Sequence, residues 1–112
     1  MKIYHNPRCR KSRETLEILK TYSKKITVVE YLKTPPSKIE IKQILQMLNI
    51  EAKDLIRKGE PEFKENYKGK ELTEDEWIDA MVKFPKLIER PIVVSNNKAV
   101  IGRPPENVRK LL

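Results

Sequence analysis

The chain has 112 residues, one cysteine, one histidine and a formal net charge of +8. This length suffices for one hydrophobic core of modest size, so we expect a single domain over residues 1–112. A lone cysteine excludes an internal disulfide, and with one histidine it cannot form a cysteine-rich zinc site, so we expect no metal.

The sequence also limits where the protein works and what it binds. The opening MKIYHNPRC lacks the apolar run of a signal peptide, and no stretch is long and apolar enough for a membrane span, so we expect a cytoplasmic protein without membrane contact. Basic residues are spread from Lys2 to Lys110 among sixteen acidic ones, which argues against nucleic acid as the main ligand. A small anion would account for local positive charge equally well.

The first third of the chain predicts a β-α-β unit. Lys2 to His5 is a short β-like run that ends at an Asn-Pro turn signal. A helix is predicted from about Arg10 to Tyr22, with Cys9 at or just before its N-terminus, and Ile26 to Tyr31 predicts a second strand in a right-handed parallel crossover. The residues at helical spacing are Leu16, Leu19 and Tyr22, with Thr15 and Ile18 beside them.

The middle of the chain predicts helices. Ser37 with Glu40, and Thr73 with Glu76, have the S/T-x-x-E form of a capping box, and Asn49 suggests the end of the first of these helices. Between them, residues 51–72 predict short helical turns and loops. The side chains expected to face the core are Ile41, Ile44, Leu45 and Leu48 in the first helix, and Trp77, Ile78, Met81 and Val82 in the second.

The last third predicts a β-hairpin and a final helix. IVVS and KAVIG flank two asparagines, Asn96 and Asn97, which tolerate the positive φ of a tight turn. GRPPENVRKLL then predicts a helix with Val108, Leu111 and Leu112 on one face. The element order indicates an α/β protein of thioredoxin-like fold: a small mixed four-stranded sheet flanked by helices, with a helical insertion.

The lone cysteine stands among cations. Arg8, Arg10, Lys11 and Arg13 surround Cys9, and cations together with a helix N-terminus favour a thiolate, which is the nucleophilic form. A loop between a strand and a helix is also where α/β folds bind ligands. The alternative is an inert cysteine beside a solvated charged face. The C-x5-R pattern of thiolate phosphatases is absent.

The segment YHNPRCRKSRETL resembles the active-site segment of the glutaredoxin-coupled arsenate reductases, the thioredoxin-like ArsC family. The likeness continues through YLKTPPS, LIRKGE, ERPIVV and IGRPPENV, and so covers essentially the entire chain. It implies that Cys9 attacks arsenate and that Arg57, Arg90 and Arg103 bind the oxyanion, with Pro91 in cis. Planar guanidinium groups suit this role because they donate paired hydrogen bonds to oxyanions.

Each arginine also has an ordinary alternative: a helix-end charge for Arg57, a loop contact for Arg90 and a partner for a surface acid for Arg103. The resemblance further suggests that His5 orients the loop or favours the thiolate, although a structural histidine fits equally well. Ser12 would donate a hydrogen bond to the thiolate or cap the helix. Asn6 and Ser12 would shape the loop.

The resemblance implies a reduction of arsenate to arsenite through a Cys9 adduct. Because the chain has no second cysteine, glutathione and glutaredoxin are expected as external reductants, with no bound cofactor. Arg10 and Lys11 stand where family members carry small residues, so the preferred anion is open. Two alternatives are a glutathione-dependent thiol reductase and a redox regulator that binds RNA polymerase. The regulator typically has C-x-x-C, and Ser12 argues against it.

Overall fold

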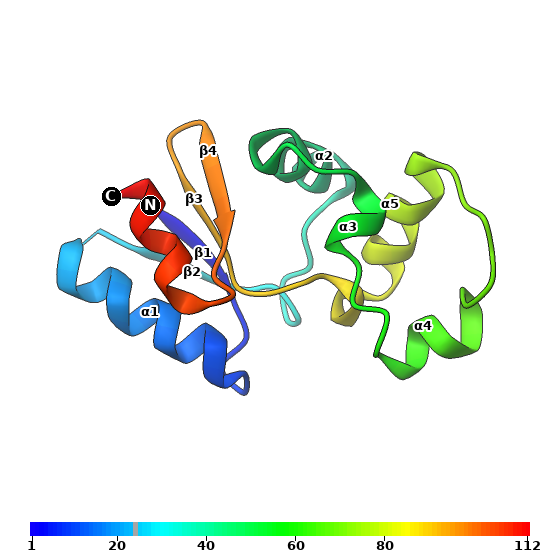
Figure 1. Ribbon diagram of the computed structural model, residues 1–112, viewed down its shortest axis with the longest axis horizontal. Helices are drawn as coiled ribbons and strands as arrows, with labels where there is room; N and C mark the ends of the chain where they lie inside the picture. Colours follow the sequence, from blue (N-terminus) through cyan, green and yellow to red (C-terminus); the bar gives the residue numbers. More distant parts are fainter. Residues whose placement is uncertain (24) are drawn as a thin grey trace. The chain divides into compact units, whose positions relative to one another are not determined.

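The computed structural model describes residues 1–23 and 25–112, which form two compact units (Figure 1). Unit 1 consists of Met1–Thr34 and Arg90–Leu112, and unit 2 consists of Pro35–Glu89. The single domain expected over the whole chain stays a prediction.

Unit 1 is built on a four-stranded sheet with the order β2-β1-β3-β4. The central strand β1 (Lys2–His5) runs parallel to β2 (Thr27–Glu30) and antiparallel to β3 (Ile92–Ser95), which pairs in turn with the antiparallel β4 (Lys98–Ile101). Helix α1 (Arg10–Tyr22) makes the crossover between the two parallel strands. The mixed four-stranded sheet and its thioredoxin-like element order are therefore confirmed.

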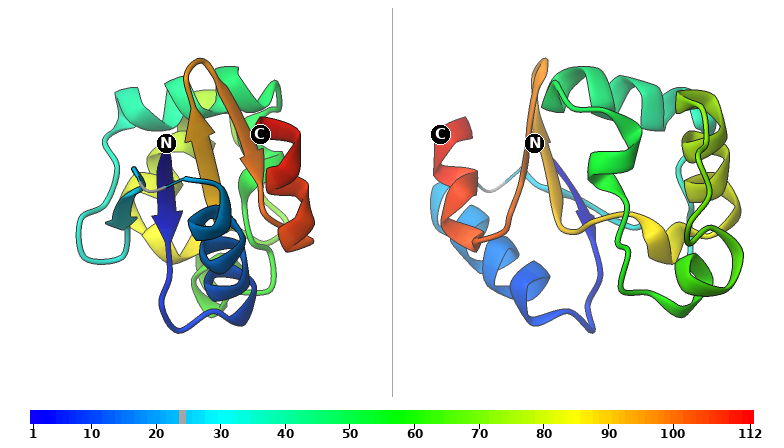
Figure 2. Two further views of the ribbon diagram at one scale, coloured as in Figure 1. Left: turned by 90° about the vertical axis from the view of Figure 1, so that its left-hand side faces the viewer. Right: turned by 45° about the vertical axis from the view of Figure 1, so that its right-hand side comes forward.

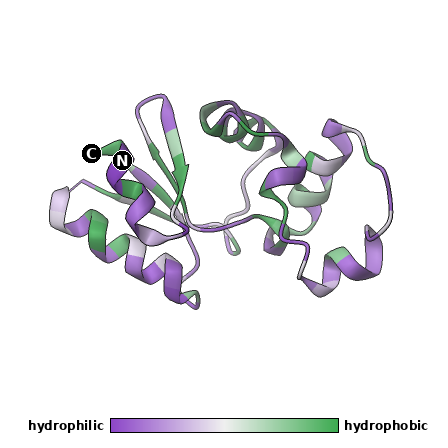
Figure 3. Cartoon of the chain, viewed as in Figure 1, coloured by the Kyte–Doolittle hydropathy of each residue, from purple (hydrophilic) through white to green (hydrophobic). Residues whose placement is uncertain are grey.

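One face of this sheet carries the core of unit 1. Helix α1 and the 3-10 helix η2 (Pro105–Leu111) lie side by side on that face (Figure 2). Hydrophilic and hydrophobic residues alternate along the turns of α1, as Figure 3 shows, so one side of the helix can be buried. The four core residues with no exposed surface are Ile3, Leu19, Val93 and Val108.

The hairpin between β3 and β4 turns as expected. Asn96 has φ of 56°, which lies in the left-handed region that asparagine tolerates better than most residues. The final helix is confirmed, and it is a 3-10 helix with Pro105 at its start.

Unit 2 is helical. Its elements are α2 (Lys38–Leu48), α3 (Ala52–Leu55), α4 (Pro61–Asn66), α5 (Glu74–Lys83) and the 3-10 helix η1 (Pro85–Leu87). Both predicted capping boxes form, because Ser37 and Thr73 each accept the backbone N–H three residues on and the glutamate there accepts the N–H in return. Asn49 ends α2 in the left-handed conformation, with φ of 56°. The short turns predicted between the two long helices are α3 and α4.

Three residues expected to face the core are exposed instead: Tyr22, Val82 and Leu112, at 57%, 38% and 49%. Tyr22 is the last residue of α1 and Leu112 the last of the chain, so both project past the buried surface. Successive residues of an α-helix lie about 100° apart, which turns Val82 away from the stripe that includes Met81. The expected burial of these three side chains is therefore wrong.

Candidate functional site

Cys9 lies at the N-cap of α1, with φ of −95° and ψ of 122°. Its N–H donates to the carbonyl of Asn6 at 3.0 Å, and its own carbonyl accepts the N–H of Arg13 at 3.0 Å. The residue is 7% exposed. The predicted place of the cysteine at the helix start is confirmed, where the dipole of the helix favours negative charge.

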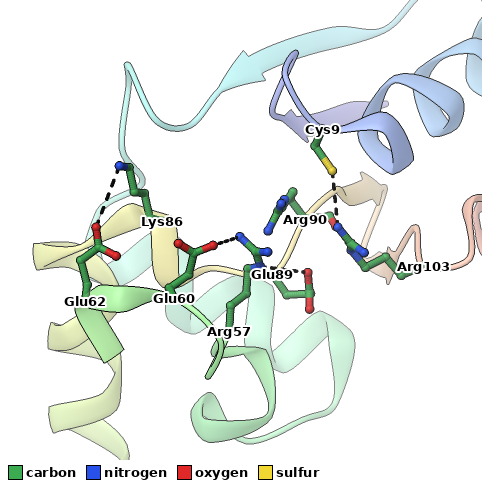
Figure 4. A network of polar contacts seen from close by, with 8 residues as sticks. All are labelled: Cys9, Arg57, Glu60, Glu62, Lys86, Glu89, Arg90 and Arg103. Atoms are coloured by element: carbon green, nitrogen blue, oxygen red, sulfur yellow. Dashed lines mark hydrogen bonds and ion pairs between the residues drawn. The ribbon is translucent and has the colours of Figure 1, made fainter. Parts of the chain in front are cut away.

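An arginine side chain contacts the sulfur of Cys9. Nη2 of Arg103 donates to Cys9 Sγ at 3.4 Å, as Figure 4 shows, although the two residues are separated by 94 positions. Nε of the same guanidinium donates to the backbone carbonyl of Arg90 at 2.8 Å. The loop after β1 and the ends of the β3–β4 hairpin thus bring Cys9, Arg90 and Arg103 together in unit 1.

Two proline bonds lie next to these arginines. The peptide bonds Arg90–Pro91 and Arg103–Pro104 are both cis. The cis form expected for Pro91 is therefore confirmed, and the cis bond at Pro104 is a second one that the sequence motifs do not predict.

The hydroxyl of Ser12 joins the end of β1 to the start of α1. Ser12 Oγ lies 2.6 Å from Nδ1 of His5 and accepts the N–H of Asn6 at 3.0 Å. The side chain of Asn6 accepts the N–H of Arg8 at 3.0 Å, which holds the loop before Cys9. The partners of Ser12 are therefore His5 and Asn6. Of the three roles predicted for Ser12, these contacts fit loop-shaping, and not a bond to the thiolate or a helix cap. The loop-shaping role of Asn6 fits these contacts.

His5 is buried, with 5% of its surface exposed. Burial lowers the pKa of this imidazole, the carboxylate of Glu30 opposes that effect, and the positive charges of Arg13 and Lys20 add to it. Ser12 Oγ already accepts the N–H of Asn6, so its hydroxyl hydrogen can be donated to Nδ1. This arrangement suits a neutral imidazole that carries its proton on Nε2.

The cations beside Cys9 differ in their surroundings. Nε of Arg10 pairs with Glu14 at 2.8 Å, and Nη1 of Arg13 donates to the carbonyl of Pro7 at 3.0 Å. Arg8 and Lys11 are exposed. Two of the four cations, Arg10 and Arg13, thus interact with residues close to them in the sequence.

Arg57 belongs to unit 2, where it follows α3. Its N–H donates to the carbonyl of Leu87 at 2.8 Å, and its side chain forms ion pairs with two carboxylates (Figure 4). Nη1 donates to Glu60, and Nε lies 3.8 Å from Oε1 of Glu89. Arg57 is thus a paired cation within its own unit, and its place in an oxyanion site with Cys9 stays a prediction.

Three residues that the motifs did not single out as functional make hydrogen bonds at the backbone next to Arg103. They are Thr15 on α1, Gly102 after β4 and Asn107 on η2. Their contacts are made with main-chain carbonyl groups, so no motif of chemically reactive side chains marks them. The one available signal is a glycine directly after a strand, which is typical of a close backbone approach.

The described residues, 1–23 and 25–112, gather no cluster of three or more His, Cys, Asp or Glu side chains suited to a metal ion. In this same part of the chain, no helix combines the length and the apolar character that a bilayer crossing requires.

Comparison with known proteins finds relatives that match the whole chain. It is 49% identical over 114 residues to Uncharacterized protein YfgD of Escherichia coli strain K12, covering 100% of this chain and 96% of that protein. It is 40% identical over 114 residues to Arsenate reductase of Neisseria meningitidis serogroup A, covering 100% and 97%. Among solved structures, Arsenate reductase from Vibrio cholerae matches with a TM-score of 0.93 and 46% identity, covering 100% and 98%. The model of the ArsC family matches residues 4–111, and the chain therefore belongs to the ArsC family.

Proposed function

We propose that this protein is an arsenate reductase in which Cys9 is the nucleophile and Arg103 binds the oxyanion beside it. The observation that carries the proposal is the contact between Arg103 Nη2 and Cys9 Sγ, at 3.4 Å, at the N-terminus of α1. A guanidinium at this position can bind an oxyanion oxygen while the sulfur attacks the central atom. Membership of the ArsC family and the names of several relatives support the same activity.

In the first step, the Cys9 thiolate attacks the arsenic atom of arsenate. A sulfur–arsenic bond forms, and one arsenic–oxygen bond breaks as that oxygen leaves as water after protonation. Arsenic stays in the +5 state in this adduct. Two anions approach each other in the step, so the guanidinium groups of Arg57, Arg90 and Arg103, which the resemblance assigns to the oxyanion, would offset their repulsion.

The reduction itself needs two electrons from outside the chain, because Cys9 is its only cysteine. Two glutathione thiols supply them: arsenate and two glutathiones yield arsenite, glutathione disulfide and water, with glutaredoxin completing the exchange at the adduct. The protein would work in the cytoplasm, where glutathione keeps thiols reduced. His5, Asn6, Ser12 and Pro91 would support the loop and the Cys9–Arg103 geometry without touching the arsenic.

The test is arsenate-dependent oxidation of NADPH in an assay with glutathione, glutaredoxin and glutathione reductase. Cys9→Ser should abolish turnover, and Arg103→Ala should lower kcat/KM by about 100-fold or more, as expected for the loss of a charged donor at the reacting group. Arg109→Ala serves as the matched control, because Arg109 is an exposed arginine on η2 of the same unit. Its kcat/KM should equal that of the unaltered protein.

Two results would overturn the proposal: arsenate turnover by the Cys9→Ser variant, or none by the unaltered protein. Reduction of a glutathione mixed disulfide at the same rate with and without arsenate would identify a thiol reductase. Capture of RNA polymerase, with no turnover of either substrate, would instead identify the regulator.

A further inference from the structure

We infer that Asn107 and Thr15 are positioning residues that hold the backbone of Arg103 so that its guanidinium stays at the sulfur of Cys9. The inference rests on the proposed function, because it explains how the oxyanion-binding arginine is kept in place. Both residues act on the main chain that carries Arg103, and not on the sulfur itself.

Asn107 holds this backbone from the side of η2. Its Nδ2 donates to the carbonyl of Ile101 at 3.3 Å and to the carbonyl of Arg103 at 3.0 Å. A primary amide has two N–H bonds, so both donors of this side chain are used. The two carbonyls lie on either side of Gly102, and the amide therefore spans the turn from β4 into Arg103.

Thr15 holds the same backbone from the side of α1. This threonine is completely buried, and its one hydroxyl hydrogen is shared between the carbonyl of Lys11 at 2.8 Å and the carbonyl of Gly102 at 3.3 Å. The N–H of Gly102 donates to the carbonyl of Pro91 at 2.9 Å. A Cβ atom at Gly102 would lie 2.6 Å from Thr15 Oγ1 and 2.9 Å from Cγ of Pro91, so the approach requires glycine.

These contacts matter because an arginine side chain is long and adopts many rotamers. The hydrogen bonds that orient the guanidinium of Arg103 include one from Nε to the carbonyl of Arg90 and one from Nη2 to Cys9 Sγ. Both depend on where the backbone of Arg103 lies. A displacement of about 1 Å at such a site can lower a rate by roughly 100-fold.

The test uses isosteric variants that remove only the polar groups. Asn107→Leu removes both amide donors, and Thr15→Val removes the hydroxyl, with little change of shape and none of charge. Matched controls are Asn66→Leu, which removes a bond from Nδ2 to the carbonyl of Glu62 at 2.9 Å, and Thr21→Val, which removes one from Oγ1 to the carbonyl of Ile18 at 2.6 Å. Thermal unfolding of each full-length variant establishes that it is folded.

The main measurement is the rate constant for alkylation of Cys9 by iodoacetamide at neutral pH, which reports on the sulfur and needs no arsenate. Arg103→Ala, measured in parallel, defines the direction of the effect. Asn107→Leu and Thr15→Val should change the rate in that direction by about threefold or more, the equivalent of one ordinary hydrogen bond. The two controls should leave the rate unchanged, and Thr15→Ser, which keeps the hydroxyl, should restore it.

A double-mutant cycle separates positioning from a general structural role. If Asn107 acts through Arg103, adding Asn107→Leu to Arg103→Ala should leave the alkylation rate at the value of the single Arg103 variant. An equal change in both backgrounds would overturn the inference, as would unchanged rates in folded Asn107→Leu and Thr15→Val proteins. Absence of arsenate turnover would contradict the proposed function while leaving this cycle intact.

Discussion

Nδ1 of His5 and the hydroxyl oxygen of Ser12 lie 2.6 Å apart in the interior of unit 1. The contact connects the last residue of β1 with the first turn of α1, on either side of the loop that carries Cys9. Ser12 has no exposed surface, so a proton added to Nδ1 would displace the hydroxyl hydrogen inside the protein. The contact with Ser12 and the lowered pKa of His5 thus both favour the neutral imidazole.

The lowered pKa of His5 predicts a pH-dependent stability. The unfolded chain, in which histidine titrates near its usual pKa of about 6.5, binds the proton before the folded chain does. The stability that neutral His5 contributes is therefore fully present above about pH 6.5 and is lost as the pH falls from there toward the lower folded pKa. Urea unfolding at several pH values should show this loss.

The matched variant is His5→Asn, whose amide can accept the Ser12 hydroxyl but does not titrate. Its free energy of unfolding should fall less between about pH 8 and pH 5 than that of the unaltered protein. If the free energies of unfolding of the two proteins changed in parallel with pH, His5 would have the same pKa in the folded and unfolded states, and the prediction would be wrong.

Gly102 predicts a sharp difference between two glycine-to-alanine substitutions. Gly102→Ala would place a Cβ 2.6 Å from the buried Oγ1 of Thr15, and overpacking of this kind costs about 1–3 kcal/mol of unfolding free energy. Gly59→Ala is the control, because among the described residues beyond its chain neighbours no atom lies within 4 Å of the place that its Cβ would take. That change should stay within about 0.5 kcal/mol. Equal stabilities of the two variants in urea would contradict the close approach.

Local signals predicted the elements because they act over a few residues. The capping residues Ser37 and Thr73 and the left-handed Asn49 are recognised by their nearest neighbours in the chain, and all three predictions are confirmed. Burial at the margin of a helix depends on how far the neighbouring elements extend. Periodicity does not contain that information, which is why the burial of Tyr22, at the end of α1, and of Leu112 is predicted wrongly.

The residues of the site also fall into two groups: those that the sequence predicts and those that only the structure reveals. The Asn-Pro turn placed Cys9 at a helix start, and the family resemblance named Arg103 as a partner across 94 positions. Thr15 and Asn107 remained unrecognised, because a threonine in an apolar stripe and an asparagine in a terminal helix are ordinary residues there. Their importance depends on which carbonyls come near them, and this follows only from the path of the backbone.

Helix α1 offers a test of the predicted buried face. Leu19 has no exposed surface, whereas Tyr22, one turn later, is 57% exposed. Leu19→Ala should lower the free energy of unfolding by about 2–5 kcal/mol, because it leaves a cavity between α1 and the sheet. Tyr22→Ala should cost about 0.5 kcal/mol or less. A similar loss of unfolding free energy in both variants, measured by thermal or urea unfolding, would contradict the difference in burial between the two side chains.

The ion pair between Arg57 and Glu60 leads to a prediction about the proposed substrate. Both side chains are half-buried, and Glu89 lies 3.8 Å from the same guanidinium. If Arg57 binds arsenate, these carboxylates compete with the oxyanion for it. Glu60→Gln should therefore lower the KM for arsenate about twofold to fivefold, which corresponds to the 0.5–1 kcal/mol of an ordinary ion pair. Glu60→Gln should leave the KM unchanged in an Arg57→Ala background, because that variant has no guanidinium for Glu60 to pair with.

The control for this effect is Glu62→Gln in the same unit, since the carboxylate of Glu62 lies 3.9 Å from Nζ of Lys86 and faces that lysine in Figure 4. Its KM should equal that of the unaltered protein, which would exclude a general effect of removing one negative charge. A raised KM for Glu60→Gln would indicate that Glu60 orients Arg57 toward the anion and does not compete with the anion for Arg57. Equal KM values for the unaltered, Glu60→Gln and Glu62→Gln proteins would contradict the prediction that Glu60 competes with arsenate for Arg57.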